Sequence, residues 1–270
     1  MTRLSLLMAL FCSLYLSVPG CMWAQDFGVI KPLSQLTGED YSYGIDFLFF
    51  TRLAEGELRL VETGEPDVLR AELVGRTLGI ASWLAGDRTQ TYSSLMRLLP
   101  DGSLDSIEHV SQIRKKRWGK WKNSGKIRRF DYIKGQITEE RLKDGVVSST
   151  KVHDIPDDKH PVDILTAFYN LRTGIYGPLQ RGTKIFIPTY SGKGFVDFEV
   201  RVLTVEEQAS QDYFPDHGLL IQVKVDPEIF ETNSGSLYVW FDDLGVPGRG
   251  IVEDLIGLGD IRGYLDKEGK

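Results

Sequence analysis

Side chains that could carry out chemistry are few in this chain and are seldom grouped. The one cluster of metal-ligand types comprises His153-Asp154, Asp157-Asp158 and His160, around Pro156. A metal site needs several such groups converging from fixed directions, whereas a polar stretch around a proline is typical of a solvated loop. The sequence has no Gly-x-Ser-x-Gly, His-Glu-x-x-His, Walker or Cys-x-x-Cys motif. We therefore predict no catalytic residues, no metal and no cofactor, although a hydrolase with an unrecognised site stays open.

The most distinctive segment is the run 114–129, which contains nine basic residues and no acidic one. In a chain of formal charge −6 this is a strong asymmetry. One interpretation is a docking surface for an anionic envelope component, such as lipid headgroups, lipopolysaccharide phosphates or an acidic glycan, with tryptophan as interfacial anchor. The other is a solvated hairpin with its turn at Asn123-Ser-Gly125, whose lysines block edge pairing. The candidate binding residues are Arg114, Lys115, Lys116, Arg117, Trp118, Lys120 and Trp121.

Aromatic residues suggest a second candidate site, an apolar pocket for an acyl chain. Closed or half-closed sheets commonly hold one apolar ligand, and ordinary core packing is the alternative. Trp240 alternates with Val239 and Phe241, so one of the two strand faces must point outward or into a pocket. We therefore add Trp240 to the candidate binding residues. The aromatic residues considered are Phe47, Phe49, Phe50, Trp83, Phe168, Tyr169 and Trp240.

Residues 1–24 have the order of an export signal: a positively charged start, a short apolar run, and then Pro19-Gly20, which breaks it. The apolar run is too short to span a bilayer comfortably. The residues up to Cys21 resemble a lipobox in which this cysteine would be acylated, whereas a cut after Ala24 would release the protein. We expect a periplasmic protein, either free or anchored as a lipoprotein, and this compartment disfavours nucleic acid as a partner.

The rest of the chain predicts a mainly β protein. Apolar and polar residues alternate in short runs separated by turn residues about every ten positions, which favours an antiparallel meander. Such a meander would form a strongly curved sheet or a flattened barrel. Hydrophobic residues make up 41% of the chain, enough for a core without disulfides. Strands are expected at 41–50, 57–61, 68–74, 89–98, 106–113, 130–133, 137–142, 184–187, 196–203, 219–225, 235–241 and 251–255.

One segment breaks the strand pattern. Apolar residues in 161–172 recur with helical spacing, Pro161 stands at the start and Gly174 lies just past the end. We predict one principal helix there, either inside the curve of the sheet or capping one end of it. The expected organisation is a linker over 25–40, a single β-rich domain over 41–265 with halves 41–155 and 156–265, and a tail over 266–270.

Several segments of this sequence together resemble the domain-of-unknown-function 3108 family, a set of exported bacterial envelope proteins. The resemblance rests on Asp163–Arg172, Gly182, the strand 195–205, Gly235–Asp243, Val246-Pro247 and the closing 257–265, with Arg128–Asp131 upstream. It implies a β-rich periplasmic protein and carries over no catalytic residue.

Three classes of function therefore remain. The first is a non-catalytic protein that binds an amphipathic or anionic envelope molecule, with peripheral contact to the membrane. The second is an interaction or assembly factor of the envelope, and the third is the unrecognised hydrolase. A cavity that could hold an acyl chain would favour the first class, whereas exposed apolar patches over a filled interior would favour the second.

Overall fold

The computed structural model describes residues 30–47, 50–78, 87–117, 119–191, 194–230, 232–255 and 259–266. The predicted export signal with Cys21, and the candidate Trp118, lie outside these ranges. The first-half elements are α1 (Leu33–Leu36), β1 (Asp40–Phe47), β2 (Phe50–Glu62), β3 (Val68–Thr77), β4 (Arg88–Leu98), β5 (Leu104–Arg117), β6 (Lys120–Asp131), β7 (Gln136–Lys143) and β8 (Val146–Asp154). The second-half elements are α3 (Ile164–Arg172), β9 (Lys184–Ser191), β10 (Gly194–Val202), α4 (Val205–Ala209), β11 (Leu219–Lys224), β12 (Ser236–Phe241), β13 (Pro247–Leu255) and β14 (Gly259–Leu265).

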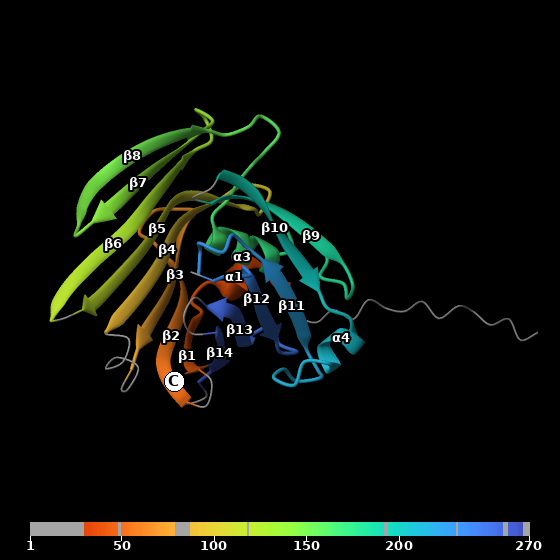
Figure 1. Cartoon of the computed structure of the whole chain (residues 1–270). Coiled ribbons are helices and arrows are strands. Elements are labelled where there is room, and N and C mark those ends of the chain that lie inside the picture. Colours follow the sequence, from red (N-terminus) through yellow and green to blue (C-terminus); the bar gives the residue numbers. More distant parts are fainter. Residues whose placement is uncertain are drawn as a thin grey trace, which may run out of the picture.

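The strands form one 14-stranded sheet in the order β8-β7-β6-β5-β4-β3-β2-β1-β14-β13-β12-β11-β10-β9. Every pairing between these strands is antiparallel. The sheet is strongly curved (Figure 1), and β8 and β9 are its two open edges. The predicted mainly β meander is therefore confirmed, in its open rather than closed form. The pairing of β1 with β14 joins the first and second halves of the chain into one sheet.

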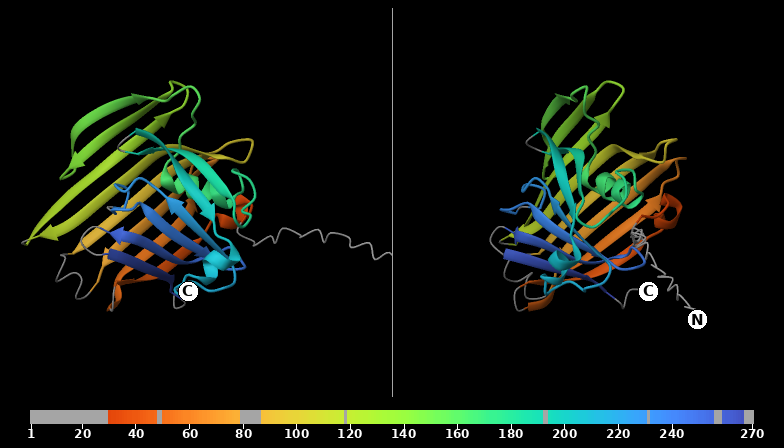
Figure 2. Two further views of the ribbon diagram at one scale, coloured as in Figure 1. Left: turned by 45° about the vertical axis from the view of Figure 1, so that its right-hand side comes forward. Right: turned by 90° about the vertical axis from the view of Figure 1, so that its right-hand side faces the viewer.

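Helix α3 lies on the concave side of the sheet, as the two views of Figure 2 show, and contacts β3, β4, β5 and β9. It starts three residues later than 161, because Asp163 is the N-cap: its side chain accepts hydrogen bonds from the amides of Leu165 and Thr166. Of the two placements that the sequence left open, the structure has the helix inside the curve of the sheet, where most of its residues are buried.

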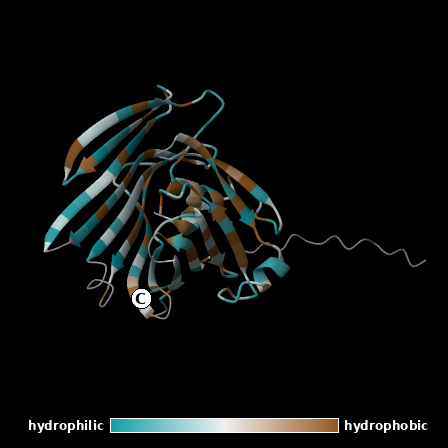
Figure 3. Cartoon of the chain, in the orientation of Figure 1, coloured by the Kyte–Doolittle hydropathy of each residue, from teal (hydrophilic) through white to brown (hydrophobic). Residues whose placement is uncertain are grey.

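Two apolar clusters meet at this helix and form most of the core. Ala167 and Leu171 pack into the first cluster, together with inward-facing residues of β9 to β12. Leu165 and Tyr169 pack into the second, together with residues of β2 to β4 and with Leu36 of α1. The alternation of brown and teal bands along the strands in Figure 3 is the visible form of this one-sided burial. A single helix therefore supplies apolar surface to both halves of the sheet.

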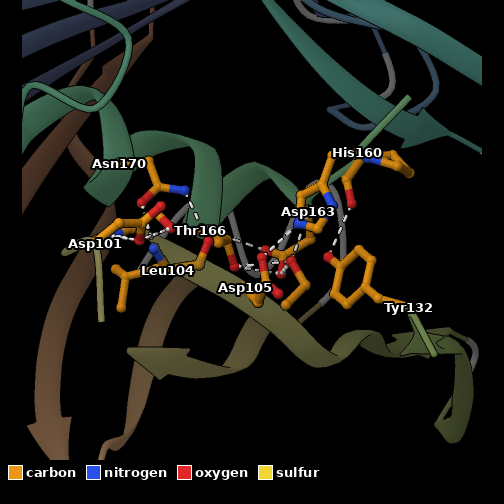
Figure 4. Close-up of polar contacts among 11 residues, drawn as sticks. Asp101, Leu104, Asp105, Tyr132, His160, Asp163, Thr166 and Asn170 are labelled. Carbon is orange, nitrogen blue, oxygen red and sulfur yellow. Dashed lines mark hydrogen bonds and ion pairs between the residues drawn. The ribbon is translucent and has the colours of Figure 1, made fainter. Parts of the chain in front are cut away.

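Polar contacts fix the position of α3 along the sheet (Figure 4). Asn170 donates its Nδ2 to the Leu104 carbonyl and accepts the Leu104 amide at its Oδ1, each at 2.8 Å. Tyr132 donates its hydroxyl to the Pro161 carbonyl at 2.9 Å, just before the helix. The helix is thus tied to the start of β5, and the segment just before it is tied to the turn that follows β6.

Residues 30–40, which the sequence placed in a linker, pack against the domain. Leu36 is fully buried, and the backbone amide of Lys31 donates to the Arg172 carbonyl at 2.8 Å. Arg172 itself is fully buried and binds Glu39 through two nitrogens, at 2.5 and 2.8 Å. Burial alone would lower the pKa of Arg172, but the hydrogen bond and attraction to Glu39 outweigh it and raise the pKa.

The hairpin turn of the basic run differs from the predicted one. The ladder pairs Arg117 with Lys120, so the chain reverses there and not at Asn123-Ser-Gly125, which lies inside β6. Gly119 has a φ of 75°, a left-handed value that glycine adopts without steric cost. The turn preference of Asn123-Ser-Gly125 is outweighed because a turn nearer the start of the run lets β5 and β6 form a longer hydrogen-bonded ladder. Of the predicted strand 130–133, the first two residues are the end of the 12-residue strand β6 and the last two lie in the turn that follows it.

Candidate functional site: a cationic cleft beside an apolar pocket

A cleft of about 580 Å³ opens on the concave side of β4 to β7, between these strands and the second half of the sheet. This volume falls within the range of roughly 300–1,000 Å³ that is typical of small-molecule sites. Among the described residues, six cations line the cleft, namely Lys115, Lys122, Lys126, Arg128, Arg141 and Lys143. Three carboxylates line it as well, Asp144, Asp163 and Glu228. The lining therefore carries an excess of positive charge.

The basic run divides between the two faces of the sheet, because successive side chains on a strand point to opposite sides. On β5, Lys115 lines the cleft, whereas its neighbours Arg114 and Lys116 pack against Trp121 away from it. On β6, Lys122, Lys126 and Arg128 continue the cleft side. Lys122, Lys126 and Arg128 were not among the candidate residues from the sequence, although their spacing of two is readable once the strand is extended to Lys120.

A buried carboxylate holds the cleft arginines in place. Arg128 donates its Nε to Glu139 at 2.9 Å, and Arg141 lies 3.5 Å from the other oxygen of the same carboxylate. Burial alone would raise the pKa of Glu139, but attraction and the hydrogen bond from Arg128 lower it. The Arg128 guanidinium also lies over the Tyr190 ring at 5.4 Å. Both guanidinium groups are thereby oriented before any ligand arrives.

An ion pair crosses the cleft. Lys126 of β6 lies 3.9 Å from Glu228, which belongs to the segment between β11 and β12. Next to Glu228, the carbonyl of Ile229 accepts a hydrogen bond from Tyr92 at 2.6 Å. These two contacts link the strand wall of the cleft to the opposite half of the sheet.

The inner end of the cleft is a fully satisfied polar cluster around Asp163. This carboxylate accepts hydrogen bonds from the hydroxyls of Ser94, Ser106 and Thr166, in addition to the two helix amides. Burial alone would raise the pKa of Asp163, but attraction to His109 and these hydrogen bonds lower it far below its usual range. Asp163 is therefore an ionised cap that anchors the helix start in the cleft wall (Figure 4).

Serine, histidine and aspartate do meet here, but not in the geometry of a catalytic triad. In a triad, histidine uses one ring nitrogen for the serine and the other for the aspartate. Here Nδ1 of His109 lies 2.9 Å from Ser94 Oγ and 3.3 Å from Asp163 Oδ1, so one nitrogen serves both. Ser94 also donates its hydroxyl to Asp163 and is fully buried. The cluster orients the helix cap and does not present an activated nucleophile.

An apolar pocket of about 180 Å³ adjoins the cleft beneath α3. Tyr92, Ile164 and Phe198 line both spaces, so the pocket continues from the inner end of the cleft. Phe168, one of the aromatic residues considered from the sequence, lies in the pocket wall. The complete wall consists of Leu58, Leu73, Tyr92, Ile164, Leu165, Ala167, Phe168, Leu171, Ile187, Phe198, Val200, Val223, Val225, Phe230, Leu237 and Val239.

Trp240 lies on the opposite face of β12 from this pocket. Its indole Nε1 donates to the His217 carbonyl at 2.7 Å, and its ring packs against Leu203, Phe214 and Leu220. A β-carbon at Gly248 would approach this ring to 2.7 Å, so the neighbouring strand needs glycine there. The side chain is therefore part of a core cluster on the outer side of the sheet, and does not join the cleft cations.

The candidate residues from the basic run have separate positions. Lys115 lines the cleft, Arg114 and Lys116 contact Trp121 on the other face, and Lys120 begins β6 at the exposed end of the hairpin. Arg117 is the last residue of β5. Arg141 and Lys143 could not be identified from the sequence, because only the pairing of β7 with β6 brings them beside the basic run.

Within the ranges that the structure describes, no three histidine, cysteine, aspartate or glutamate side chains are grouped so that they could hold a metal ion. Over the same ranges, the structure has no helix that is both long and apolar enough to cross a membrane.

Comparison with known protein families assigns the chain to one of them. A family described as "Protein of unknown function (DUF3108)" matches residues 41–257, which is most of the sequence and nearly all of the sheet. The chain therefore belongs to this family, as the resemblance of its helix and closing strands indicated. Searches of curated proteins and of solved structures found no match.

Proposed function

We propose that this protein is a non-catalytic binding protein of the bacterial envelope that holds an anionic amphipathic molecule. The charged head of the ligand would lie in the cationic cleft and its hydrocarbon tail in the apolar pocket. The observation that carries this proposal is the continuity of the two spaces through Tyr92, Ile164 and Phe198. A single ligand that spans both must be charged at one end and apolar at the other.

The head site suits a phosphate or carboxylate. Arg128 and Arg141 each use Nε on Glu139, which leaves their terminal nitrogens to meet the ligand. Guanidinium groups fixed in this way match the planar, two-point geometry of oxyanions. Lys122 and Lys126 add two further cations to the lining of the cleft, which attract an anion over a longer range.

The tail site suits a short stretch of hydrocarbon. Its wall consists of aliphatic and aromatic side chains, and cavities of that kind stay dry and take up apolar ligands. At about 180 Å³ it is smaller than a full drug-sized site. The pocket would therefore hold one end segment of an acyl chain, with the remainder of the chain in the cleft.

The proposed location is the periplasm, either free or through an acylated Cys21. The support for this is the charged start, apolar run and helix breaker of residues 1–24. A ligand with a charged head and an acyl tail is a typical component of the envelope on that side of the inner membrane.

Isothermal titration calorimetry with three compounds tests the proposal. Octyl phosphate has both a charged head and an apolar tail, octanol has only the tail, and inorganic phosphate has only the head. We expect octyl phosphate to bind more tightly than either part, with the negative heat-capacity change of apolar burial. K126E/R141E should weaken octyl phosphate binding, and K151E, on the exposed edge strand, serves as the charge control. V239F fills the pocket and should weaken octyl phosphate but not inorganic phosphate, with V196F as the matched control. Equal affinity of octyl phosphate for all these variants would reject the proposal.

A further inference from the structure

The side of the β5–β6 hairpin that faces away from the cleft is a separate feature. Trp121 is 43% exposed there, and the Arg114 guanidinium lies over its ring at 4.3 Å. The Lys116 ammonium lies 5.8 Å from the same ring centre. This aromatic ring, approached by two cations, stays partly exposed within the described part of the chain, and the cleft ligand does not need it.

The neighbouring turn adds apolar surface to the same end of the sheet. The ladder places Lys143, at the end of β7, opposite Ser124 of β6. The strand β8 then begins with Val146 and Val147, which are 69% and 47% exposed. Figure 1 shows the free end of the β5–β6 hairpin and the β7–β8 turn on the same side of the molecule, projecting from the body of the sheet. This end of the sheet therefore combines exposed cations, an exposed indole and exposed valines.

We infer that this end of the sheet docks on an anionic lipid bilayer. Tryptophan prefers the headgroup level of a membrane, and each cation near an anionic leaflet adds about 1 kcal/mol of attraction. Exposed valines beside them have no role in binding a soluble polyanion, whereas they gain by burial at the headgroup boundary. The cations and the indole belong to the strands that also line the cleft, so docking would bring the mouth of the cleft close to the lipid. The inference does not depend on what the cleft binds.

Vesicle co-sedimentation tests the docking surface in the full chain. Wild-type protein should bind vesicles of phosphatidylglycerol mixed with phosphatidylcholine, and should be released by high salt, but should not bind pure phosphatidylcholine. R114E/K116E should lower the partition coefficient on the mixed vesicles by at least roughly 30-fold, since two attracting cations are lost and two repelled anions replace them. R70E/R97E makes the same change in net charge on β3 and β4 and should leave the partition coefficient within about twofold of wild type.

Removing the indole of Trp121 distinguishes binding to a lipid surface from binding to other anions. W121A should weaken binding to the mixed vesicles and leave the retention of the protein on immobilised polyphosphate unchanged. Octyl phosphate titration of the same variants shows that each is folded, and it keeps a failure of the cleft proposal distinct from a failure of docking. Wild-type affinity of R114E/K116E for mixed vesicles, or of W121A, would overturn the inference.

Discussion

Lys115 and Lys122 lie directly opposite each other in the β5–β6 ladder, and both side chains line the cleft. Like charges in directly opposed positions destabilise a sheet. On the other side of the same ladder, Arg114 faces Asn123 and Lys116 faces Trp121, so those cations are placed beside neutral partners. The repulsive pair is thus confined to the side where an anion would relieve it.

Replacing one of these lysines should therefore change stability and binding in opposite directions. K122E places opposite charges across the ladder and should raise the free energy of unfolding by about 0.2–1 kcal/mol. The same change should weaken octyl phosphate binding. Urea denaturation and calorimetry measure the two effects, and high salt should reduce both. A loss of stability in K122E would contradict the account of the pair as a functional compromise.

The Asp163 cluster should be essential to stability. D163N keeps the size of the side chain but offers one acceptor where two ionised oxygens now receive five hydrogen bonds. Its amide would also face donors, so we expect a loss of roughly 3 kcal/mol in the free energy of unfolding. D158N, on the exposed loop before the helix, should change it by less than about 0.5 kcal/mol. Similar unfolding midpoints for the two variants would show that Asp163 is not the anchor of the helix.

The pair of Glu39 and Arg172 should fasten the N-terminal segment to the domain. E39Q leaves a fully buried guanidinium without its counter-charge, and breaking a buried pair in this way costs about 3–5 kcal/mol. Urea denaturation of E39Q, with E65Q as an exposed control, measures the difference. An E39Q protein as stable as E65Q would mean that residues 30–40 are dispensable for the fold.

Stability should also depend on His160 in a definite pH window. The hydrogen bond to Asp105 at 2.6 Å raises the pKa of His160 above its ordinary 6.5, although partial burial opposes this. A raised pKa means that the protonated form is favoured by folding, so this contribution is complete below pH 6.5 and is lost as the pH rises through the folded pKa. The stability difference between wild type and H160Q should therefore shrink at alkaline pH. A difference independent of pH would refute the ionic role of His160.

The sequence was sufficient for the class of fold because a period of two is a local property. It also identified the helix, whose apolar spacing and flanking Pro161 and Gly174 break the strand pattern. The turn position predicted for the hairpin was wrong, because the ladder between two long strands outweighs the turn preference of Asn123-Ser-Gly125. Local residue preferences do not show how much stability is gained when two long strands pair.

The site was only partly predictable for the same reason. Lys115 was identified through the basic run, but the division of that run between two faces depends on where β6 begins. Arg141 joins the cleft through the pairing of β7 with β6, and Phe198 joins it through the curvature of the whole sheet. Trp240 packs in a core cluster. Its alternation with Val239 in the sequence did not show which of the two side chains faces a pocket.

Methyl NMR with octyl phosphate tests most directly whether one ligand occupies both the cleft and the pocket. Ile113 reports on the cleft, Ile164 on the shared wall and Val200 on the apolar pocket, while Ile251 lies outside both. The account predicts that the first three shift together with a single dissociation constant, that Ile251 does not shift, and that inorganic phosphate moves only Ile113. Shifts confined to Ile113, or separate dissociation constants for Ile113 and Val200, would contradict it.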